Sequence, residues 1–469
     1  MKLFLRYLGY ILIISAMFTL LPITVGIFYQ ESIISFVVSA LISIILALIL
    51  YYTSKSIKTQ ESSLSLTSGL SLVATAFMVI PVIGAISFLK SFNYNLLNAF
   101  FESVSGYTTT GFTLYSTLEG LPKSLLIWRA ETQWMGGIGI IIVFLFIFSR
   151  LRAHTLRPLE EQKSVKSSLA LYQAQGFSDK FAAGIKGTTT NILLIYVGYT
   201  VLGIILLFLT GMPLLESIGM SFTSISTGGF TLSDTFYQNN LQLGILSLLM
   251  IFGSISFITH NKLIRFKIKE FIIDTRFLLI TAAAALLVYI STKDIGTALF
   301  ETISAFTTTG YTLSEVSLLP QLFISVIVIG MVIGGNVGST AGGIKIFRIH
   351  VLTKSIPWTI KKLLSPPHAI IPFKINKKPV EEKELLIVHT FIFTYMLILV
   401  FASLSFMLLG YSFLDSTFQV VSALGTVGMQ SMQLAGLHWL GKSILIVCMI
   451  LGRLEIFPLF VLIGKLFKR

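Results

Sequence analysis

Long apolar runs alternate with short polar and basic stretches along almost the whole chain. Many of these runs reach roughly 20 residues, the length that an α-helix needs to cross the hydrocarbon core of a bilayer. The sequence therefore predicts an all-α polytopic membrane protein. The predicted spans are residues 7–28, 33–53, 69–89, 125–148, 190–210, 241–260, 276–291, 321–358 with a break, 385–409 and 443–464.

Four shorter apolar segments lead into four copies of one threonine-glycine loop. The copies are centred on Gly111, Gly229, Gly310 and Gly428, with gaps of 118, 81 and 118 residues. The first and last gaps are equal, which is typical of a repeated structural unit, and the short segments cannot cross a membrane. We therefore predict four repeats of span, pore helix, filter loop and span around a central pore, preceded by two extra transmembrane helices. The predicted pore helices are residues 95–107, 214–226, 296–306 and 414–425.

This repeat divides the chain into seven units. They are two N-terminal transmembrane helices (1–60), pore repeat 1 (61–150), a cytoplasmic linker (151–188), pore repeat 2 (189–265), pore repeat 3 with a broken inner helix (266–344), an inner-helix extension with a second cytoplasmic linker (345–384), and pore repeat 4 (385–469).

Composition and charge agree with this topology. The chain is 54% hydrophobic and 12% charged, with a mean hydropathy of +0.87, which is typical of membrane proteins. All but six of the 34 Lys and Arg residues lie in segments that the predicted topology places on one side. The positive-inside rule makes that side the cytoplasm, so both termini are cytoplasmic and the loops open outward. The net charge of +14 then reflects anchoring at the inner face and requires no nucleic-acid partner.

The repeated loop has the chemistry of a cation filter. A cation that enters a membrane must exchange water for oxygen ligands, and rings of backbone carbonyls supply them. Glycine permits the dihedral angles that turn carbonyls inward, and threonine is small. We expect the ligands at each glycine and the two residues before it, namely Thr109, Thr110, Gly111, Thr227, Gly228, Gly229, Thr308, Thr309, Gly310, Thr426, Val427 and Gly428.

The predicted pore helices carry acids in a pattern. Glu102 and Glu301 lie nine residues before their glycines, whereas Glu216 and Asp415 lie thirteen before theirs. Because the difference is about one helical turn, all four acids can face the same way. They either form an acidic surround that concentrates cations or braces the filter, or simply stabilise the first turns of short helices.

A glycine-rich segment interrupts the predicted span 321–358. Several closely spaced glycines disfavour a continuous helix, so we expect a loop that could plug the inner pore. The alternative is a packing ridge of small residues, because four of the glycines recur every fourth position. The candidate gate residues are Gly335, Asn336, Gly338, Ser339, Thr340, Gly342, Gly343 and Arg453.

Arg453 falls inside the last predicted span, where a charge is costly and marks function by default. Its guanidinium either forms a barrier to cations, or holds the glycine-rich loop by hydrogen bonds, or serves as a structural clamp. Glu455 is two positions away, nearly on the opposite side of a helix, and is therefore a poor partner.

The sequence contains none of the catalytic motifs expected of an enzyme. It has no nucleophile elbow, no H-E-x-x-H zinc motif and no pair of histidines at metal-ligand spacing. Gly436–Ser443 fits a phosphate-loop pattern but lacks the preceding strand. Other classes that the sequence leaves open are a secondary transporter with a midplane substrate site, a sodium- or proton-coupled cation symporter, and a less selective potassium and sodium pathway.

Together with the filter loops, three segments carry a resemblance to a known family: Gln133–Ile140, Gly335–Lys345 and Leu451–Phe457. With them, the chain resembles the Trk/Ktr/HKT superfamily of potassium transport proteins, and within it the TrkH type. The resemblance implies potassium as the ion, no organic cofactor, and a homodimer in the inner membrane of a prokaryote. It also implies a cytosolic nucleotide-binding ring of TrkA type as regulator, and a gate at Gly335–Gly343 that faces Arg453. The basic connections 150–188 and 345–384 either dock that ring or anchor at the membrane surface.

Overall fold

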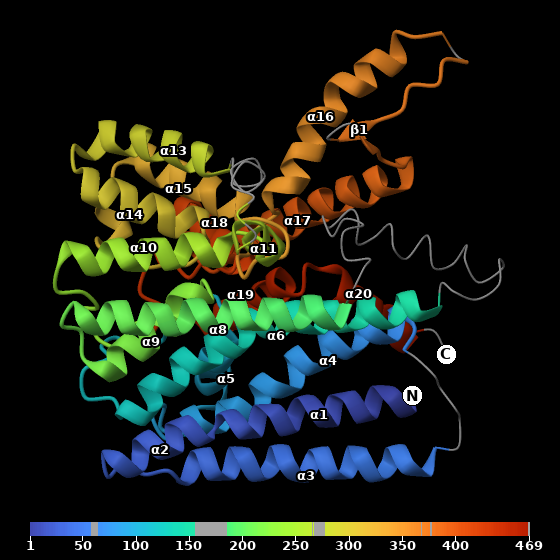
Figure 1. Cartoon of the computed structure of the whole chain (residues 1–469). Coiled ribbons are helices and arrows are strands. Elements are labelled where there is room, and N and C mark those ends of the chain that lie inside the picture. Colours follow the sequence, from blue (N-terminus) through green and yellow to red (C-terminus); the bar gives the residue numbers. More distant parts are fainter. Residues whose placement is uncertain are drawn as a thin grey trace.

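The computed structural model describes residues 1–57, 64–154, 185–264, 266, 277–366, 368–375 and 378–467. Helices make up most of this part of the chain, and many of them run roughly side by side through the body of the molecule (Figure 1). By length and composition, five described helices could cross a membrane, or six if one sharply bent pair counts as a single span. The prediction of an all-α polytopic membrane protein is confirmed.

The N-terminal helices form one edge of the molecule. Helix α1 (Lys2–Phe18) continues as α2 (Leu20–Phe28), and α3 (Ile34–Ser56) returns beside α1 (Figure 1). Large apolar side chains on α1 and α3 are exposed, for example Ile14 and Ile45. This exposure is expected where the neighbour is lipid.

The four repeats follow in order, each with a span, a pore helix of 12 residues and a second span. The elements of the first two repeats are α4 (Leu66–Gly84) with η1 (Ala85–Phe88), α5 (Leu96–Tyr107) and α6 (Lys123–His154), then α8 (Ile185–Leu209), α9 (Leu214–Ile225), α10 (Asn240–Ser254) and α11 (Phe257–Ile264). Those of the last two are α13 (Phe277–Thr292), α14 (Ile295–Phe306), η3 (Val316–Leu318), α15 (Gln321–Ile333) and α16 (Ile346–Leu363), then α17 (Glu382–Leu408), α18 (Phe413–Leu424), α19 (Trp439–Arg453) and α20 (Phe457–Phe467).

Packing of the pore helices closes the repeats into a ring. Each pore helix, α5, α9, α14 or α18, lies between the two spans of its own repeat. The second span of each repeat also packs on the pore helix of the next: α6 on α9, α10 on α14, α15 on α18, and α19 back on α5. At this last junction, Lys442 Nζ donates a hydrogen bond of 2.8 Å to Asn98 Oδ1. The four repeats therefore surround a common axis.

Local sequence explains where three pore helices begin. Asn95, Asp294 and Ser412 precede α5, α14 and α18, and each side chain accepts a hydrogen bond from a backbone N–H of the first turn. Such residues satisfy donors that a helix start leaves open. Helix α9 follows Pro213, which makes no such side-chain cap.

Two of the predicted spans are interrupted. Residues 241–260 do not form one helix, because α10 ends at Ser254 and α11 begins at Phe257. Residues 443–464 also do not form one span, because α19 and α20 meet at an angle of 104°. Glu455 and Ile456 have positive φ at this bend, and the Glu455 carboxylate pairs with Arg348. Tertiary contacts therefore bend a segment whose mostly apolar pattern predicts a single span.

The predicted span 321–358 breaks as expected, between Ile333 and Ile346. A continuous small-residue ridge over the four regularly spaced glycines is therefore wrong, since Gly334 and Gly338 have positive φ. Beyond the break, α16 projects from the body (Figure 1). A two-stranded antiparallel hairpin of β1 (Lys374–Ile375) and β2 (Lys378–Pro379), which the sequence did not predict, lies beside it (Figure 1).

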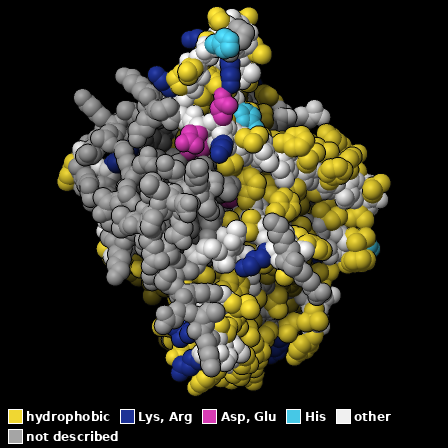
Figure 2. Space-filling view, turned by 90° about the vertical axis from the view of Figure 1, so that its right-hand side faces the viewer, with side chains coloured by type: hydrophobic (Ala, Val, Ile, Leu, Met, Phe, Trp, Pro, Cys, Tyr) yellow, Lys and Arg dark blue, Asp and Glu magenta, His cyan; other side chains and the backbone are white. Residues whose placement is uncertain are grey.

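Both termini lie at the same end of the molecule as this projection (Figure 1). Figure 2 views that end: Lys and Arg side chains lie scattered over it, and hydrophobic side chains dominate its right and lower parts. Most of the predicted linker 151–188 lies outside the described residues.

Gly452→Ala should destabilise the ring at the junction of α18 and α19. A β-carbon on Gly452 would collide with the Leu424 carbonyl and lie 3.1 Å from Thr426 Cγ2. We expect a loss of about 1–3 kcal/mol in the free energy of unfolding, as for other overpacked sites. Thermal unfolding in detergent measures it. Gly464→Ala is the control, because nothing lies within 4 Å of its β-carbon; equal melting temperatures for both variants would contradict this account.

Candidate ion filter

The four threonine-glycine loops have the same backbone conformation. In each loop the threonine two residues before the glycine has a φ between 49° and 56°, and the glycine has a φ between 77° and 92°. These threonines are Thr109, Thr227, Thr308 and Thr426. Positive φ is uncommon for threonine, so four equivalent instances indicate a functional constraint. In extended chain, successive carbonyls point to opposite sides. Left-handed dihedral angles at every second residue turn them toward one side.

The loops close a ring through backbone contacts. A β-carbon on Gly111 would collide with the Gly228 carbonyl oxygen, and the same relation joins each glycine to the following repeat. The further pairs are Gly229 with the Thr309 carbonyl, Gly310 with the Val427 carbonyl, and Gly428 with the Thr110 carbonyl. The predicted filter residues of all four repeats therefore meet, and only glycine permits this approach.

Above the ring lies a cavity of about 580 Å³ that all four glycines line. Side chains of Arg129, Asp234 and Glu315 also reach its wall. At the other side of the ring, each pore helix ends directly before its loop. Helix C-termini carry partial negative charge, so four of them favour a cation at the ring.

Two of the predicted pore-helix acids brace the chain that leaves the filter. The buried Glu102 carboxylate accepts hydrogen bonds from Leu114 N (3.0 Å) and Thr113 Oγ1 (2.9 Å). Glu301 likewise accepts from Leu313 N (2.7 Å) and Ser314 N (3.2 Å). Both lie in the middle of their helices and not in the first turn. For these two acids the first-turn alternative is wrong, and their carboxylates bond to the chain directly after the filter loop.

The other two acids differ. Asp415 and Glu216 lie in the first turns of α18 and α9 and are half-buried. Asp415 accepts a hydrogen bond from Ser431 Oγ (2.9 Å), so it still reaches the chain after its filter loop.

Sequence reasoning missed Gln419, which has the bracing role in repeat 4. It lies nine residues before Gly428, the same offset as Glu102 and Glu301 from their glycines. Its amide oxygen can accept from Ser431 N (2.9 Å) and Met432 N (3.2 Å). A pattern of acidic residues does not include a glutamine. The shared offset of nine residues from the glycine is the signal that identifies Gln419.

The candidate gate loop packs against the base of the ring. Gly342 N donates to Thr308 Oγ1 (2.7 Å), and Thr227 Oγ1 donates to Thr340 Oγ1 (3.3 Å). A β-carbon on Gly342 would also collide with the Gly425 carbonyl and the Thr426 hydroxyl. The loop therefore contacts repeats 2, 3 and 4 directly beneath their filter threonines.

The rest of the loop bonds to the interrupted helix of repeat 2. Asn336 N donates to Ser254 O (3.0 Å), and Phe257 N donates to Gly338 O (3.1 Å). The hydroxyl of Thr340 donates to Gly253 O (2.9 Å), and Ser339 Oγ donates within the loop to Asn336 O (2.5 Å).

Arg453 joins this loop to repeat 1. The residue is 4% exposed, and its guanidinium donates to Thr340 O (2.6 Å), Gly136 O (2.6 Å) and Gly137 O (3.1 Å). The side chain thus holds the glycine-rich loop by hydrogen bonds, one of the three roles that the sequence left open. It lies at the C-terminus of α19, beside the bend, and not within a straight span.

Glu102→Gln and Glu301→Gln should differ in stability. Glu102 also pairs with the buried Arg129, at 2.9 Å, whereas Glu301 Oε2 has no hydrogen-bond partner among the described residues. Glu102→Gln leaves an uncompensated buried charge and should cost about 3 kcal/mol. Glu301→Gln should cost about 1 kcal/mol or less, because a glutamine already has this role in repeat 4. Chemical or thermal unfolding in detergent compares them, and equal losses would contradict the assignment.

Comparisons with known proteins agree with this geometry. The model of the TrkH family, described as a cation transport protein, matches residues 34–292 and 270–468. An uncharacterized cation transporter of Methanocaldococcus jannaschii is 32% identical to the chain, over 99% of the chain and 95% of that protein. The Trk system potassium uptake protein TrkH of Salmonella typhimurium is 28% identical, over 99% and 98%. The crystal structure of the potassium transporter TrkH from Vibrio parahaemolyticus has the same fold, with a TM-score of 0.83, 24% identity and coverage of 100% and 99%. The chain belongs to the TrkH family of cation transport proteins.

Proposed function

We propose that this chain carries potassium ions across the cell membrane of a prokaryote through the ring of four threonine-glycine loops. The observation that carries the proposal is the closed contact of each glycine with a carbonyl of the next repeat. Backbone oxygens gathered in this way can replace the water shell of a cation. Potassium comes from the relatives, several of which are named as potassium uptake proteins.

The glycine-rich loop is the gate of this proposal. It lies directly beneath the filter threonines, and Arg453, Thr308 and the carbonyls of Gly253 and Ser254 hold it there. Removal of the loop from the conduction path requires these hydrogen bonds to break together. Helix α16 continues directly from the loop, so a movement of this inner helix acts on all of these bonds at once.

Regulation by a cytosolic nucleotide-binding ring of TrkA type, and assembly as a homodimer, complete the proposal. Helix α16 projects at the end where the termini lie, and its Lys354, Lys361 and Lys362 side chains are exposed (Figure 1). A basic, projecting helix that continues directly from the gate loop is suited to transmit the movement of a partner. In the orientation that the positive-inside rule predicts, both termini and the end of the molecule from which α16 projects face the cytoplasm.

The test is flux of rubidium and sodium in liposomes that contain the purified protein, with and without a proton gradient. Selective, passive rubidium flux supports the proposal. Flux that requires the proton gradient would instead identify a coupled symporter, and the absence of potassium-like selectivity would identify a less selective cation pathway.

Gly310→Ser should reduce the preference for potassium over sodium. The new β-carbon would collide with the Val427 carbonyl, and a φ of 90° is strained for serine. We expect a reduction of about tenfold, the effect of ~1.4 kcal/mol in the relative binding of two ions. Gly436→Ser, with nothing within 4 Å of its β-carbon, is the control. Unchanged selectivity in Gly310→Ser would remove the loop from the filter.

Arg453→Gln should raise basal flux. The substitution weakens the bonds from the guanidinium to Thr340 O and to Gly136 O, so the loop leaves its position more often. Single-liposome or bulk rubidium flux without any partner protein measures the change. Lys465→Gln neutralises an exposed charge on the neighbouring α20 and should leave flux unchanged. Wild-type flux in Arg453→Gln would contradict the gating role.

A further inference from the structure

Repeat 2 departs from the other repeats at its filter loop. Repeats 1, 3 and 4 brace the chain after the filter from their own pore helices, through Glu102, Glu301 and Gln419. The corresponding position of repeat 2, nine residues before Gly229, is the apolar Met220. The second residue of its loop is also a glycine, Gly228, where repeats 1 and 3 have threonine.

A side chain from repeat 1 supplies the missing brace. Gln133 of α6 is fully buried, and its Nε2 donates a hydrogen bond of 2.6 Å to the Gly228 carbonyl oxygen. Its Oε1 accepts a bond of 3.0 Å from Phe230 N. One amide therefore holds the loop on both sides of Gly229, and the carbonyl it holds belongs to the proposed filter.

The side chain of Gln133 leaves no room for a side chain at position 228. A β-carbon on Gly228 would collide with Gln133 Oε1 and lie 2.9 Å from Gln133 Cβ. Gly228 is not among the glycines with positive φ, so its backbone conformation does not require glycine. The glycine is required because the glutamine fills the volume that a threonine side chain takes in repeats 1 and 3.

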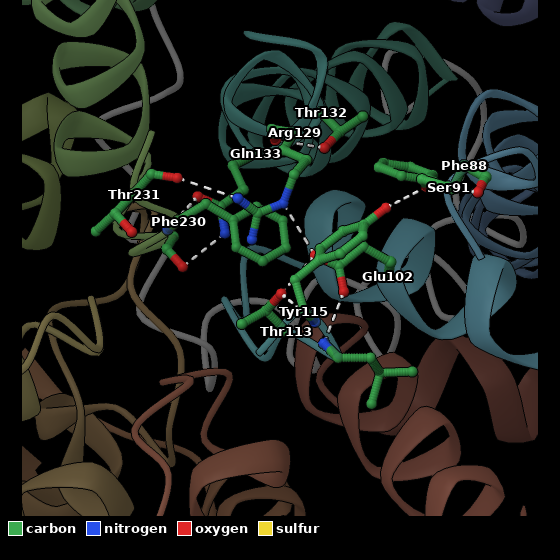
Figure 3. A network of polar contacts seen from close by, with 12 residues as sticks. Phe88, Ser91, Glu102, Thr113, Tyr115, Arg129, Thr132, Gln133, Phe230 and Thr231 are labelled. Carbon is green, nitrogen blue, oxygen red and sulfur yellow. Dashed lines mark hydrogen bonds and ion pairs between the residues drawn. The ribbon is translucent and has the colours of Figure 1, made fainter. Parts of the chain in front are cut away.

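Arg129 lies one helical turn before Gln133 and fixes the same stretch of loop (Figure 3). It donates to Thr231 O (3.0 Å) and Glu102 Oε1 (2.9 Å), and its guanidinium carbon lies 4.1 Å from the centre of the Phe230 ring. Cation–π contact and a buried ion pair hold this turn of α6 against the loop. The amide of Gln133 therefore approaches Gly228 from a rigid support.

We propose that Gln133 is a positioning residue that sets the ion selectivity of the filter by fixing the direction of the Gly228 carbonyl. This inference rests on the proposed function. The Gly228 carbonyl also lies against Gly111, so its direction decides how repeats 1 and 2 meet in the ring. Without the amide donor, this carbonyl can tilt toward a smaller ion, and sodium gains relative to potassium.

The test is the ratio of rubidium to sodium flux in liposomes for Gln133→Met and Gln133→Leu. Methionine is close to glutamine in shape but cannot donate to the carbonyl, so the change removes the bond and leaves the volume nearly intact. We expect the ratio to fall about fivefold, the effect of one lost hydrogen bond. The control is Gln242→Met, the same exchange at a fully buried glutamine that bonds to Gln238 N (2.7 Å) and Thr210 O (3.4 Å), outside the filter loops.

A reduced ratio in both Gln133 variants, with the control unchanged, supports the inference. A wild-type ratio in Gln133→Met or in Gln133→Leu would overturn it and leave the proposed function intact. A wild-type protein without preference for rubidium would overturn the proposed function, and this inference with it. Because the readout is a ratio, a lower yield of folded variant does not alter the result.

Discussion

The close approach of each filter glycine to a carbonyl of the next repeat is the interaction on which the rest of the structure depends. Backbone outside a helix is tolerated at membrane depth only where it is buried in protein or lines a cavity. Each of the four loops meets this condition because its neighbours enclose it. Capped pore helices, the cyclic packing of the spans and the bracing side chains all keep four short segments in mutual contact.

The interrupted inner helices follow the same constraint. The loop between α15 and α16 exposes many backbone groups, and it finds partners where other inner helices are also interrupted. The gap between α10 and α11 offers Ser254 O and Phe257 N, and Arg453 precedes the bend between α19 and α20. Three breaks in three repeats therefore meet at one place, where the loop of repeat 3 forms hydrogen bonds with both of the others.

The sequence predicted the repeated elements well, because their pattern is local. The predicted pore helix 95–107 is α5, Leu96–Tyr107, and the break in span 321–358 follows from glycine content. Prediction from the sequence failed where contacts between residues far apart in the chain determine the structure. Residues 443–464 are mostly apolar and their pattern predicts one span despite Arg453 and Glu455, and the pairing of Glu455 with Arg348 shows why the helix bends there. The contact of Gln133 with Gly228 likewise crosses between repeats, and no spacing along the chain encodes it.

Closure of the ring by α19 on α5 has a consequence for biogenesis. The polypeptide reaches the bilayer from its N-terminus, so three filter loops are in place before the fourth exists. Until then, Thr110 lacks its partner Gly428 from the far end of the chain, and one side of the assembly is open. Irregular backbone that faces lipid is strongly disfavoured, and contacts between such distant segments form late. The proposed conduction path therefore cannot mature stepwise, because a chain that stops before its last repeat retains the membrane helices yet never encloses an axis.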